Sequence, residues 1–349
     1  MKTEEHNRKP KRQINVHYDK SCVVCGASVP GEHFGDVREH EYITTSMTFP
    51  VYRCPGCDLI YLYPRPDVSE LFTIYPLDYY SNHMAMNAPV EISRKKSFVQ
   101  ELFFRIHTNN YRTRIAPYIR RMPKDRQLRV LDVGCGVGAQ LDSLKYVLPE
   151  CETYGVELGK VAAMKAKSRG HTVYLGRFEE IDLPEKYFDV IFSVHVIEHV
   201  SRPDLFLKKC LDILTDEGIV MIETPNTDCL DFDLFKKKHW GGYHPPRHWY
   251  LFQYSTFKKL AERFGCHIVA HRAYPMSNFW SWTCHSFLMD LTGRKFADVL
   301  FPPVKILYGG VRSFFILSFF AVLERILLKL TGRACSIWIV FRKNEGVEE

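Results

Sequence analysis

The stretch "LRVLDVGCGVG" (residues 128–138) decides the fold of this chain. It reads as a short apolar strand that runs into a glycine-rich loop, and a helical pattern follows at 139–148. The alternation then continues along the chain, with strands predicted at 151–157, 171–175, 188–193 and 218–224 and helices at 160–170 and 202–214. Such alternation predicts a parallel sheet with helices on both faces, and therefore an α/β fold.

The glycine loop itself points to a nucleotide-like ligand. It is not a G-x-G-x-x-G pattern, because a single residue separates Gly136 from Gly138, although an NAD-binding turn stays an alternative. The G-K-[ST] ending of a phosphate-binding loop is missing, which disfavours an NTPase. Asp132 precedes the loop, where it can orient a cationic ligand, and Glu157 ends the second strand, where a carboxylate can accept from ribose hydroxyls.

Three segments together, "VLDVGCGVG", "YGVE" and "FDVIFSVHVIEHV", resemble the class I S-adenosylmethionine-dependent methyltransferases over roughly 125–275. The resemblance implies a Rossmann-like seven-stranded sheet and S-adenosylmethionine as the cofactor. The N-terminal module with "YPRP" and "IYPLDYY" is similar to small-molecule enzymes that include sugar C-methyltransferases. "HVIEHV" and "HPPRH" are similar to segments of ubiquinone-type O-methyltransferases.

The resemblance also implies which residues bind the cofactor. Arg177 departs from the family pattern. The family often has an aspartate at this position, which accepts a hydrogen bond from the adenine amine, and arginine cannot accept a hydrogen bond. The implied contacts are Asp132 at the methionine end, Gly134, Gly136 and Gly138 at the backbone, Glu157 at the ribose, Leu158 and Phe178 near the adenine, and His195 lining the sulfonium pocket.

Two C-x-x-C pairs near the N-terminus predict a metal site. Cys22 and Cys25 in "CVVC" and Cys54 and Cys57 in "CPGC" supply four thiolates, which complete a tetrahedral zinc ion. Glycines stand at both turns, and "EYITTSMTFPVYRC" between the pairs reads as strand material, so the module resembles a zinc ribbon. The ion would be structural and closed, and a redox pair or a coincidence is the alternative.

"HVIEH" places His195, Glu198 and His199 at spacings that share one face if the segment is helical. A second divalent metal at Glu198 and His199 is therefore possible by residue type. The interpretation that we favour is packing, in which Glu198 and His199 stabilise the turn after the fourth strand and His195 touches the cofactor.

"HWGGYHPPRHWY" (239–250) follows the fifth strand, where open α/β sheets bind their ligands. Methyl transfer needs an aligned nucleophile, a proton acceptor and a dry pocket, and His244 or His248 suits the second task, with His195 as the further catalytic candidate. The alternative is a rigid turn. Because "TPN" (224–226) is not the [ND]-P-P-[YF] motif used for exocyclic amines, an oxygen or activated carbon of a small molecule, sugar or lipid-linked intermediate is the expected acceptor.

A hydrophobic insert separates the predicted sixth strand (266–274) from the last strand (335–344). Its main feature is a predicted helix over 304–330, with a break at Gly309 and Gly310. One interpretation is a helical lid over the core. The other is a surface that contacts a membrane or a lipid-linked acceptor, helped by Lys305, Arg312, Arg325 and Lys329.

The domain order follows from these motifs: a basic disordered tail (1–20), a zinc ribbon with connector (21–80), a helical linker (81–124), a cofactor-binding core (125–274), an insert or lid (275–334), and a last strand with tail (335–349). The polar start predicts no signal peptide, and eleven cysteines favour a reducing, cytoplasmic location, peripheral on the inner membrane surface if the insert meets lipid. The net charge of +7 and the ribbon leave an RNA-binding or RNA-modifying protein as the alternative. We disfavour nucleic acid because aromatic–basic recognition motifs are missing, and the oligomeric state stays open.

Overall fold

The structure is a computed structural model that describes residues 13–76, 79, 113, 115–118, 122, 124–308 and 310–344. The predicted helical linker at 81–124 lies almost entirely outside these residues, as do the first part of the predicted tail and the last five residues of the chain.

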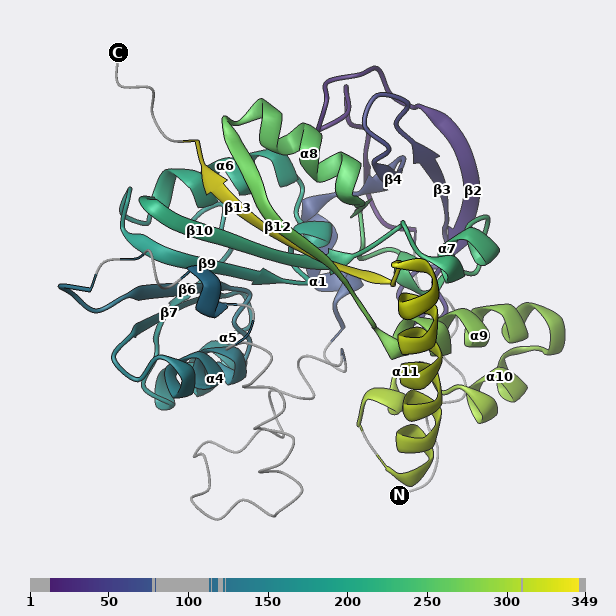
Figure 1. The fold of residues 1–349 in the computed structure, drawn as a ribbon. Helices are drawn as coiled ribbons and strands as arrows, with labels where there is room; N and C mark the ends of the chain where they lie inside the picture. Colours follow the sequence, from purple (N-terminus) through teal and green to yellow (C-terminus); the bar gives the residue numbers. More distant parts are fainter. Residues whose placement is uncertain are drawn as a thin grey trace.

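The central feature is a seven-stranded sheet with the order β12-β13-β10-β9-β6-β7-β8 (Figure 1). Neighbours among the five strands β10, β9, β6, β7 and β8 run parallel, whereas β13 is antiparallel to both β10 and β12. The strands are β6 (Arg129–Val133), β7 (Glu152–Glu157), β8 (Thr172–Leu175), β9 (Phe188–Val194), β10 (Leu214–Pro225), β12 (Cys266–Tyr274) and β13 (Ser336–Lys343). The predicted α/β fold with a Rossmann-like sheet is therefore confirmed.

Helices cover both faces of this sheet, as Figure 1 shows. One face buries Val130 against α4 (Ala139–Val147) and α5 (Lys160–Ser168). The other face buries Leu131 against α6 (Pro203–Ile213) and α8 (Tyr254–Arg263). Adjacent residues of β6 enter opposite cores because side chains alternate along a strand, which is why this strand reads as a continuous apolar run.

The N-terminal module is a second sheet with the order β11-β4-β3-β2. Its strands are β2 (Glu32–Arg38), β3 (Thr48–Arg53), β4 (Ile60–Leu62) and β11 (Tyr250–Leu251), followed in the connector by η1 (Val68–Glu70) and α1 (Leu71–Ile74). The strand β11 comes from the end of the 239–250 stretch, so this stretch is built into the module. The assignment of 13–20 to a disordered tail is wrong, since β1 (Val16–His17) pairs with β5 (Arg65–Pro66).

The insert forms a helical subdomain of α9 (Ser277–Thr292), α10 (Arg294–Leu300), η4 (Lys305–Tyr308) and α11 (Val311–Thr331). It leaves the sheet after β12 and re-enters at β13, which places it at the carboxyl edge of β10 (Figure 1). Gly310 has φ 105°, a value that favours glycine, at the predicted break before α11. Within the described residues, no helix on its own has the length and hydropathy of a membrane span, although α10–η4 and α11 satisfy both criteria as a pair bent by 90°.

Candidate functional site

The glycine loop after β6 has a backbone that only glycine adopts easily. Gly134, Gly136 and Gly138 have φ values of +81°, +54° and +82°. A Cβ at Gly134 would lie 2.5 Å from Cγ2 of Val196, whereas a Cβ at Gly136 would meet no atom within 4 Å. The loop therefore packs closely on the end of β9 on one side and is open at Gly136 on the other, which leaves room for a ligand against its backbone.

Two carboxyl groups flank this loop. Glu157 accepts hydrogen bonds from the backbone N–H groups of Gly136 (2.9 Å) and Gly159 (2.6 Å). Burial raises the pKa of Asp132 well above its usual range, and the neighbouring charge of Glu157 raises it further. Burial likewise raises the pKa of Glu157. A cationic ligand that also carries ribose hydroxyls would relieve both effects, so the residues present fit S-adenosylmethionine.

The predicted adenine contacts differ from each other in exposure. Leu158 is 47% exposed, so its side chain is available to a ligand. Phe178 is buried, and its ring lies 5.0 Å from the ring of Phe206 and 5.0 Å from Nζ of Lys209. Arg177, the departure from the family pattern, pairs with Glu180 at 2.8 Å. The roles of Leu158 and Phe178 at the adenine stay predictions.

His195 stands directly after β9 with φ 53°, next to the residue that touches Gly134. Its Nδ1 lies 3.0 Å from Oε1 of Glu198, whose other oxygen accepts from Oγ1 of Thr224 at 2.9 Å. Its Nε2 is buried and has no hydrogen-bond partner among the described residues. The ring is covered by Phe279 of α9, with centroids 6.4 Å apart.

The electrostatics of this dyad follow from its geometry. Burial acts to lower the pKa of His195, but the hydrogen bond and the negative charge of Glu198 outweigh burial and raise the pKa. Burial acts to raise the pKa of Glu198, yet the contact with His195 lowers it. The segment is not a single helix, because only Ile197–His199 forms a short 3-10 helix, η2, and His195 lies before it in a left-handed conformation.

His199 and His248 form a second buried pair, with ring centroids 4.7 Å apart. His199 Nδ1 contacts the hydroxyl of Tyr75 (2.8 Å) and the carbonyl of Arg247 (3.1 Å), while His248 Nδ1 donates to the carbonyl of Gly242 (2.7 Å). Burial lowers the pKa of His199 to about 4 and that of His248 well below its usual value. Burial therefore favours the neutral form of both rings, and together with Glu198 they present a set of ligand atoms close enough for one metal ion.

His244 is buried between the N-terminal module and the insert. Its Nδ1 is 3.3 Å from Oε1 of Glu41, its Nε2 is 3.3 Å from the hydroxyl of Tyr79, and its ring stacks on Trp282 at 5.2 Å. Burial alone would raise the pKa of Glu41, but the charges of His244 and Arg247 hold that pKa at about 2. Sequence reasoning missed Glu41, because no local pattern links it to a histidine so far along the chain.

Arg247 is fully buried and ties the same stretch to the N-terminal module. Its Nη2 pairs with Oε1 of Glu39, and its guanidinium lies 4.6 Å from the ring centre of Tyr42. The other oxygen of Glu39 accepts from Oγ1 of Thr44 at 2.7 Å. The stretch continues through η3 (Gly241–Tyr243), where the N–H of Gly241 donates to Oγ1 of Thr283 in α9. It is thus a connector between three parts of the molecule.

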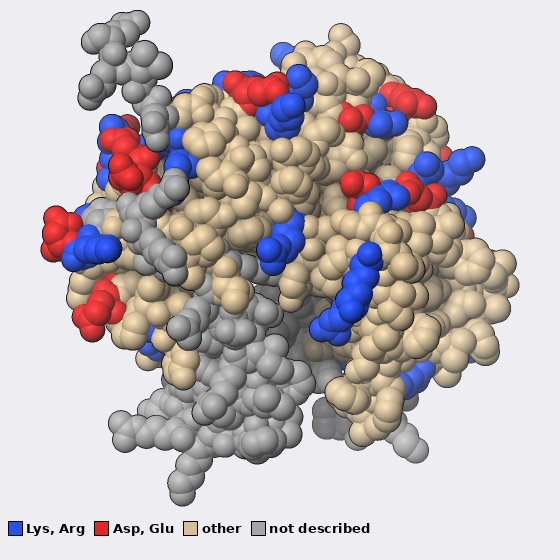
Figure 2. Space-filling view, viewed as in Figure 1, with Lys and Arg blue, Asp and Glu red and all other residues tan. Residues whose placement is uncertain are grey.

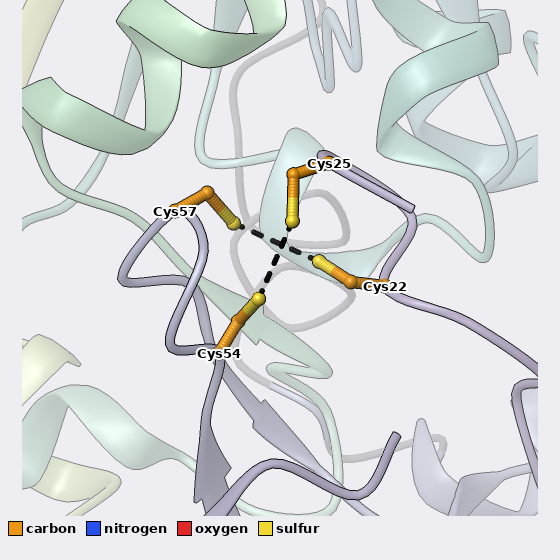
Figure 3. Close-up of side chains that lie close together, drawn as sticks. All are labelled: Cys22, Cys25, Cys54 and Cys57. Carbon is orange, nitrogen blue, oxygen red and sulfur yellow. Dashed lines mark hydrogen bonds between the residues drawn. The ribbon is translucent and has the colours of Figure 1, made fainter. Parts of the chain in front are cut away.

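The four cysteines of the N-terminal module converge as predicted from their spacing (Figure 3). Sγ atoms lie 3.7 Å apart in Cys22 and Cys57 and 3.4 Å apart in Cys25 and Cys54. Thiolates around a tetrahedral zinc ion, with bonds of about 2.3 Å, lie about 3.8 Å apart. A Cβ at Gly56 would approach Sγ of Cys25 to 3.0 Å, so a side chain there would crowd the ligand. The four thiols fit one zinc ion.

A seven-stranded sheet with one antiparallel strand, a glycine loop after its first strand and an acid at the end of its second defines a nucleotide-type site at the carboxyl edge. Residues 107–271 match the family described as "Methyltransferase domain". The chain therefore contains a class I, S-adenosylmethionine-dependent methyltransferase domain.

Two curated relatives are similar to part of this chain. The ubiquinone biosynthesis O-methyltransferase of Bradyrhizobium diazoefficiens is 32% identical over 113 residues, which are 31% of this chain and 44% of that protein. A probable S-adenosylmethionine-dependent methyltransferase of Mycobacterium tuberculosis is 29% identical over 109 residues, 31% of this chain and 40% of that protein. The chain thus spans less than half the length of these relatives.

Among solved structures, a SAM-dependent methyltransferase from Archaeoglobus fulgidus aligns with a TM-score of 0.42 and 21% identity, covering 70% of this chain and 99% of that one.

Proposed function

We propose that this chain transfers a methyl group from S-adenosylmethionine to an oxygen or an acidic carbon of a small molecule, sugar or lipid-linked intermediate, with His195 as the proton acceptor. The observation that carries the proposal is the buried Nε2 of His195 beside the glycine loop, which has no hydrogen-bond partner in the part of the chain that the structure describes. Its other ring nitrogen is held by Glu198 at 3.0 Å, an arrangement that fixes the ring and favours proton uptake at Nε2.

The chemistry divides between the ligand and the protein. S-adenosylmethionine supplies an electrophilic methyl group on a sulfonium. Asp132 and Glu157 would hold its cationic and ribose parts, and the glycine loop would let the backbone approach it. His195 would take the proton from the acceptor hydroxyl or carbon acid, and Glu198 would stabilise the imidazolium that forms. Phe279 of α9 covers this histidine and would help to exclude water.

The acceptor itself can be identified with the full chain and deuterated cofactor. Incubating cell extracts with the protein and S-adenosylmethionine carrying a CD₃ group should label one class of metabolite, which gains about 17 Da because one CD₃ group replaces one hydrogen atom of the acceptor. A labelled hydroxyl or carbon acid supports the proposal, whereas exclusive labelling of an amine or of RNA contradicts it.

Glu157 should contribute strongly to cofactor binding. We expect Glu157→Ala to weaken S-adenosylhomocysteine binding by about 1–3 kcal/mol, since a buried hydrogen-bonding carboxylate is lost. Isothermal titration calorimetry measures this change, and the exposed Glu185→Ala is the control. If the intact protein does not bind S-adenosylhomocysteine at all, the proposed activity is wrong.

We further propose that Cys22, Cys25, Cys54 and Cys57 hold one structural zinc ion. The module that contains them is small, and its contacts with the core include the hydrogen bond from Oγ1 of Thr256 to the carbonyl of Cys57 at 2.9 Å. A closed four-thiolate site would stabilise this module and take no part in methyl transfer.

The zinc proposal predicts the metal content of a single variant. Cys54→Ser should contain one zinc ion fewer per chain than the wild type, because a tetrahedral site seldom survives the loss of a thiolate. Elemental analysis measures the content, and limited proteolysis should then cut within 20–62. Cys151→Ser, which changes a buried thiol outside the group, is the control. Equal zinc contents in Cys54→Ser and wild type would contradict the assignment.

The exposed face of α11 supports membrane contact, and we propose that it binds an anionic lipid surface. The face is mostly apolar, and the exposed residues are Val311, Phe314, Phe315, Phe319, Val322, Ile326 and Leu330. Its charged members Arg312, Arg325 and Lys329 are all basic, while the acid Glu324 points inward. Figure 2 shows this surface as tan with blue and without red. Such a face matches the chemistry of an anionic membrane interface.

Replacing two phenylalanines of this face tests the lipid proposal. Phe315→Asp with Phe319→Asp should reduce sedimentation with phosphatidylglycerol-containing liposomes by about 100-fold, since about 3 kcal/mol of apolar burial is lost. Phe320, which the sequence pattern groups with Phe319, is unsuitable because it is buried against Trp280. Phe72→Asp, on an exposed residue of α1, is the control. If wild-type protein never sediments with the liposomes, α9–α11 is a lid only.

A further inference from the structure

A further group of metal-ligating side chains lies at the carboxyl edge of the sheet, apart from the cysteines of the N-terminal module and from the group of Glu198, His199 and His248. Cys229 precedes α7 (Leu230–Phe235), Asp231 lies in its first turn, and Cys335 precedes β13. One potential ligand atom from each of the three lies within 4.8 Å of the other two. All three residues are buried, with at most 1% of their surface exposed.

The backbone around this group is held by Asn226. Its N–H donates to the carbonyl of Cys335 at 2.8 Å, and its Nδ2 donates to the carbonyl of Ala334, also at 2.8 Å. The thiol of Cys229 contacts the carbonyl of Asn226 at 3.0 Å. The two cysteines are therefore fixed on opposite sides of one turn, so the position of their thiols is set by the fold.

Two further observations point to a missing ligand between these side chains. Asp231 uses Oδ2 to accept from Nε1 of Trp240 at 2.8 Å, but its buried Oδ1 has no hydrogen-bond partner among the described residues. Glu324 of α11 extends to the same place, where Oε1 contacts Sγ of Cys335 and Oε2 accepts from the N–H of Met276. Two carboxyl groups and two thiols thus share one buried volume.

We propose that Cys229, Asp231, Cys335 and Glu324 bind one divalent cation of the zinc type. Burying carboxyl groups beside thiols is unfavourable unless a cation or enough hydrogen-bond donors compensate for the lost hydration. The buried Oδ1 of Asp231, which lacks a partner among the described residues, is therefore available to coordinate a cation. Two sulfur and two oxygen ligands satisfy a tetrahedral zinc ion. Binding would release one proton from each thiol to solvent, because the ligand is the thiolate.

This site differs from the cysteine site in what it would connect. Cys229 and Asp231 belong to the α7 segment, Cys335 leads into the last core strand, and Glu324 belongs to the insert helix α11. A bound ion would therefore fasten the insert to the sheet beside the methyl-transfer site. The proposal does not depend on the proposed methyltransferase activity, since metal content can be measured without the acceptor.

The test uses the full chain, purified without chelators and then loaded with zinc. Elemental analysis should find about two zinc ions per chain, and the double variant Cys229→Ser with Cys335→Ser should contain about one. Cys151→Ser with Cys284→Ser, two thiols outside both groups, should retain the wild-type content. Combining Cys54→Ser with the first pair should remove all tightly bound zinc.

A milder variant keeps the proposal testable if the double variant does not fold. Asp231→Asn keeps the side-chain volume but loses a charged ligand, so it should release zinc to a chromogenic chelator at least about tenfold faster than wild type. Wild-type protein that holds a single zinc ion, all of it lost in Cys54→Ser, overturns the proposal. A disulfide between Cys229 and Cys335, detected by mass spectrometry of alkylated protein, also overturns it.

Discussion

His195→Ala is expected to lower methyl transfer by about 10²–10⁴-fold, the range for a positioned proton acceptor, while S-adenosylhomocysteine binding changes little. The reason is geometric, since Nε2 of this residue is buried with no partner in the described ranges of the chain and Nδ1 is held by Glu198. The measurement is the transfer of labelled methyl groups to whichever extract fraction the wild type labels, with calorimetry for the cofactor product.

The pH dependence gives a second, independent readout of the same dyad. The base must be neutral to act, so the rate should rise with pH through the pKa of His195. Because Glu198 raises that pKa, the wild-type limb should lie above the ordinary histidine value of about 6.5, which is the model-peptide pKa. Glu198→Gln removes the charge, so its limb should move to lower pH and its maximal rate should fall.

Matched histidine variants separate this assignment from the loop histidines. His267→Ala changes an exposed histidine on β12 and should leave the rate unchanged. If His244 and His248 only pack the connector, His244→Ala and His248→Ala should lower the free energy of unfolding and leave the rate of methyl transfer by the folded protein nearly unchanged. Normal turnover in His195→Ala, with losses of about 100-fold or more in His244→Ala or His248→Ala, would place the base on the 239–250 stretch instead.

Arg247→Met should lower the free energy of unfolding by about 3–5 kcal/mol, because it leaves the buried Glu39 carboxylate without its cation. Both side chains of this pair are 0% exposed. Urea unfolding monitored by tryptophan fluorescence measures the change. Replacing both partners, Arg247→Met with Glu39→Leu, should restore much of the loss, since neither charge of this pair is then left buried without the other.

A solvent-exposed pair serves as the control for this effect. Arg53 and Asp58 form an ion pair whose side chains are 44% and 32% exposed. Arg53→Met should change the free energy of unfolding by no more than about 1 kcal/mol, because water already screens the charges. If Arg247→Met is as mild as Arg53→Met, the 239–250 stretch does not hold the N-terminal module to the core in the way that the buried ion pair indicates.

The sequence by itself determined the core fold and the positions of the cofactor loop. The strand before the glycine loop and the acid after the next strand are local patterns, and the observed β6, α4 and β7 fall within two residues of the predicted segments. The cysteine group could also be predicted from the sequence, since the C-x-x-C spacing of each pair places two thiols on one turn. Periodicity and short spacings carry such features because they depend on nearest neighbours along the chain.

Only the tertiary structure decided what the histidines and the insert face. His244 and Arg247 meet Glu41 and Glu39, partners some two hundred residues earlier, and no local pattern encodes such a contact. Helix α11 turns Glu324 toward Cys335 and leaves Phe315 to solvent, the reverse of a simple amphipathic expectation. Burial and pairing of polar groups are set by which elements the fold brings together, so the spatial neighbours of a charge, and hence its function, follow from packing rather than from sequence spacing.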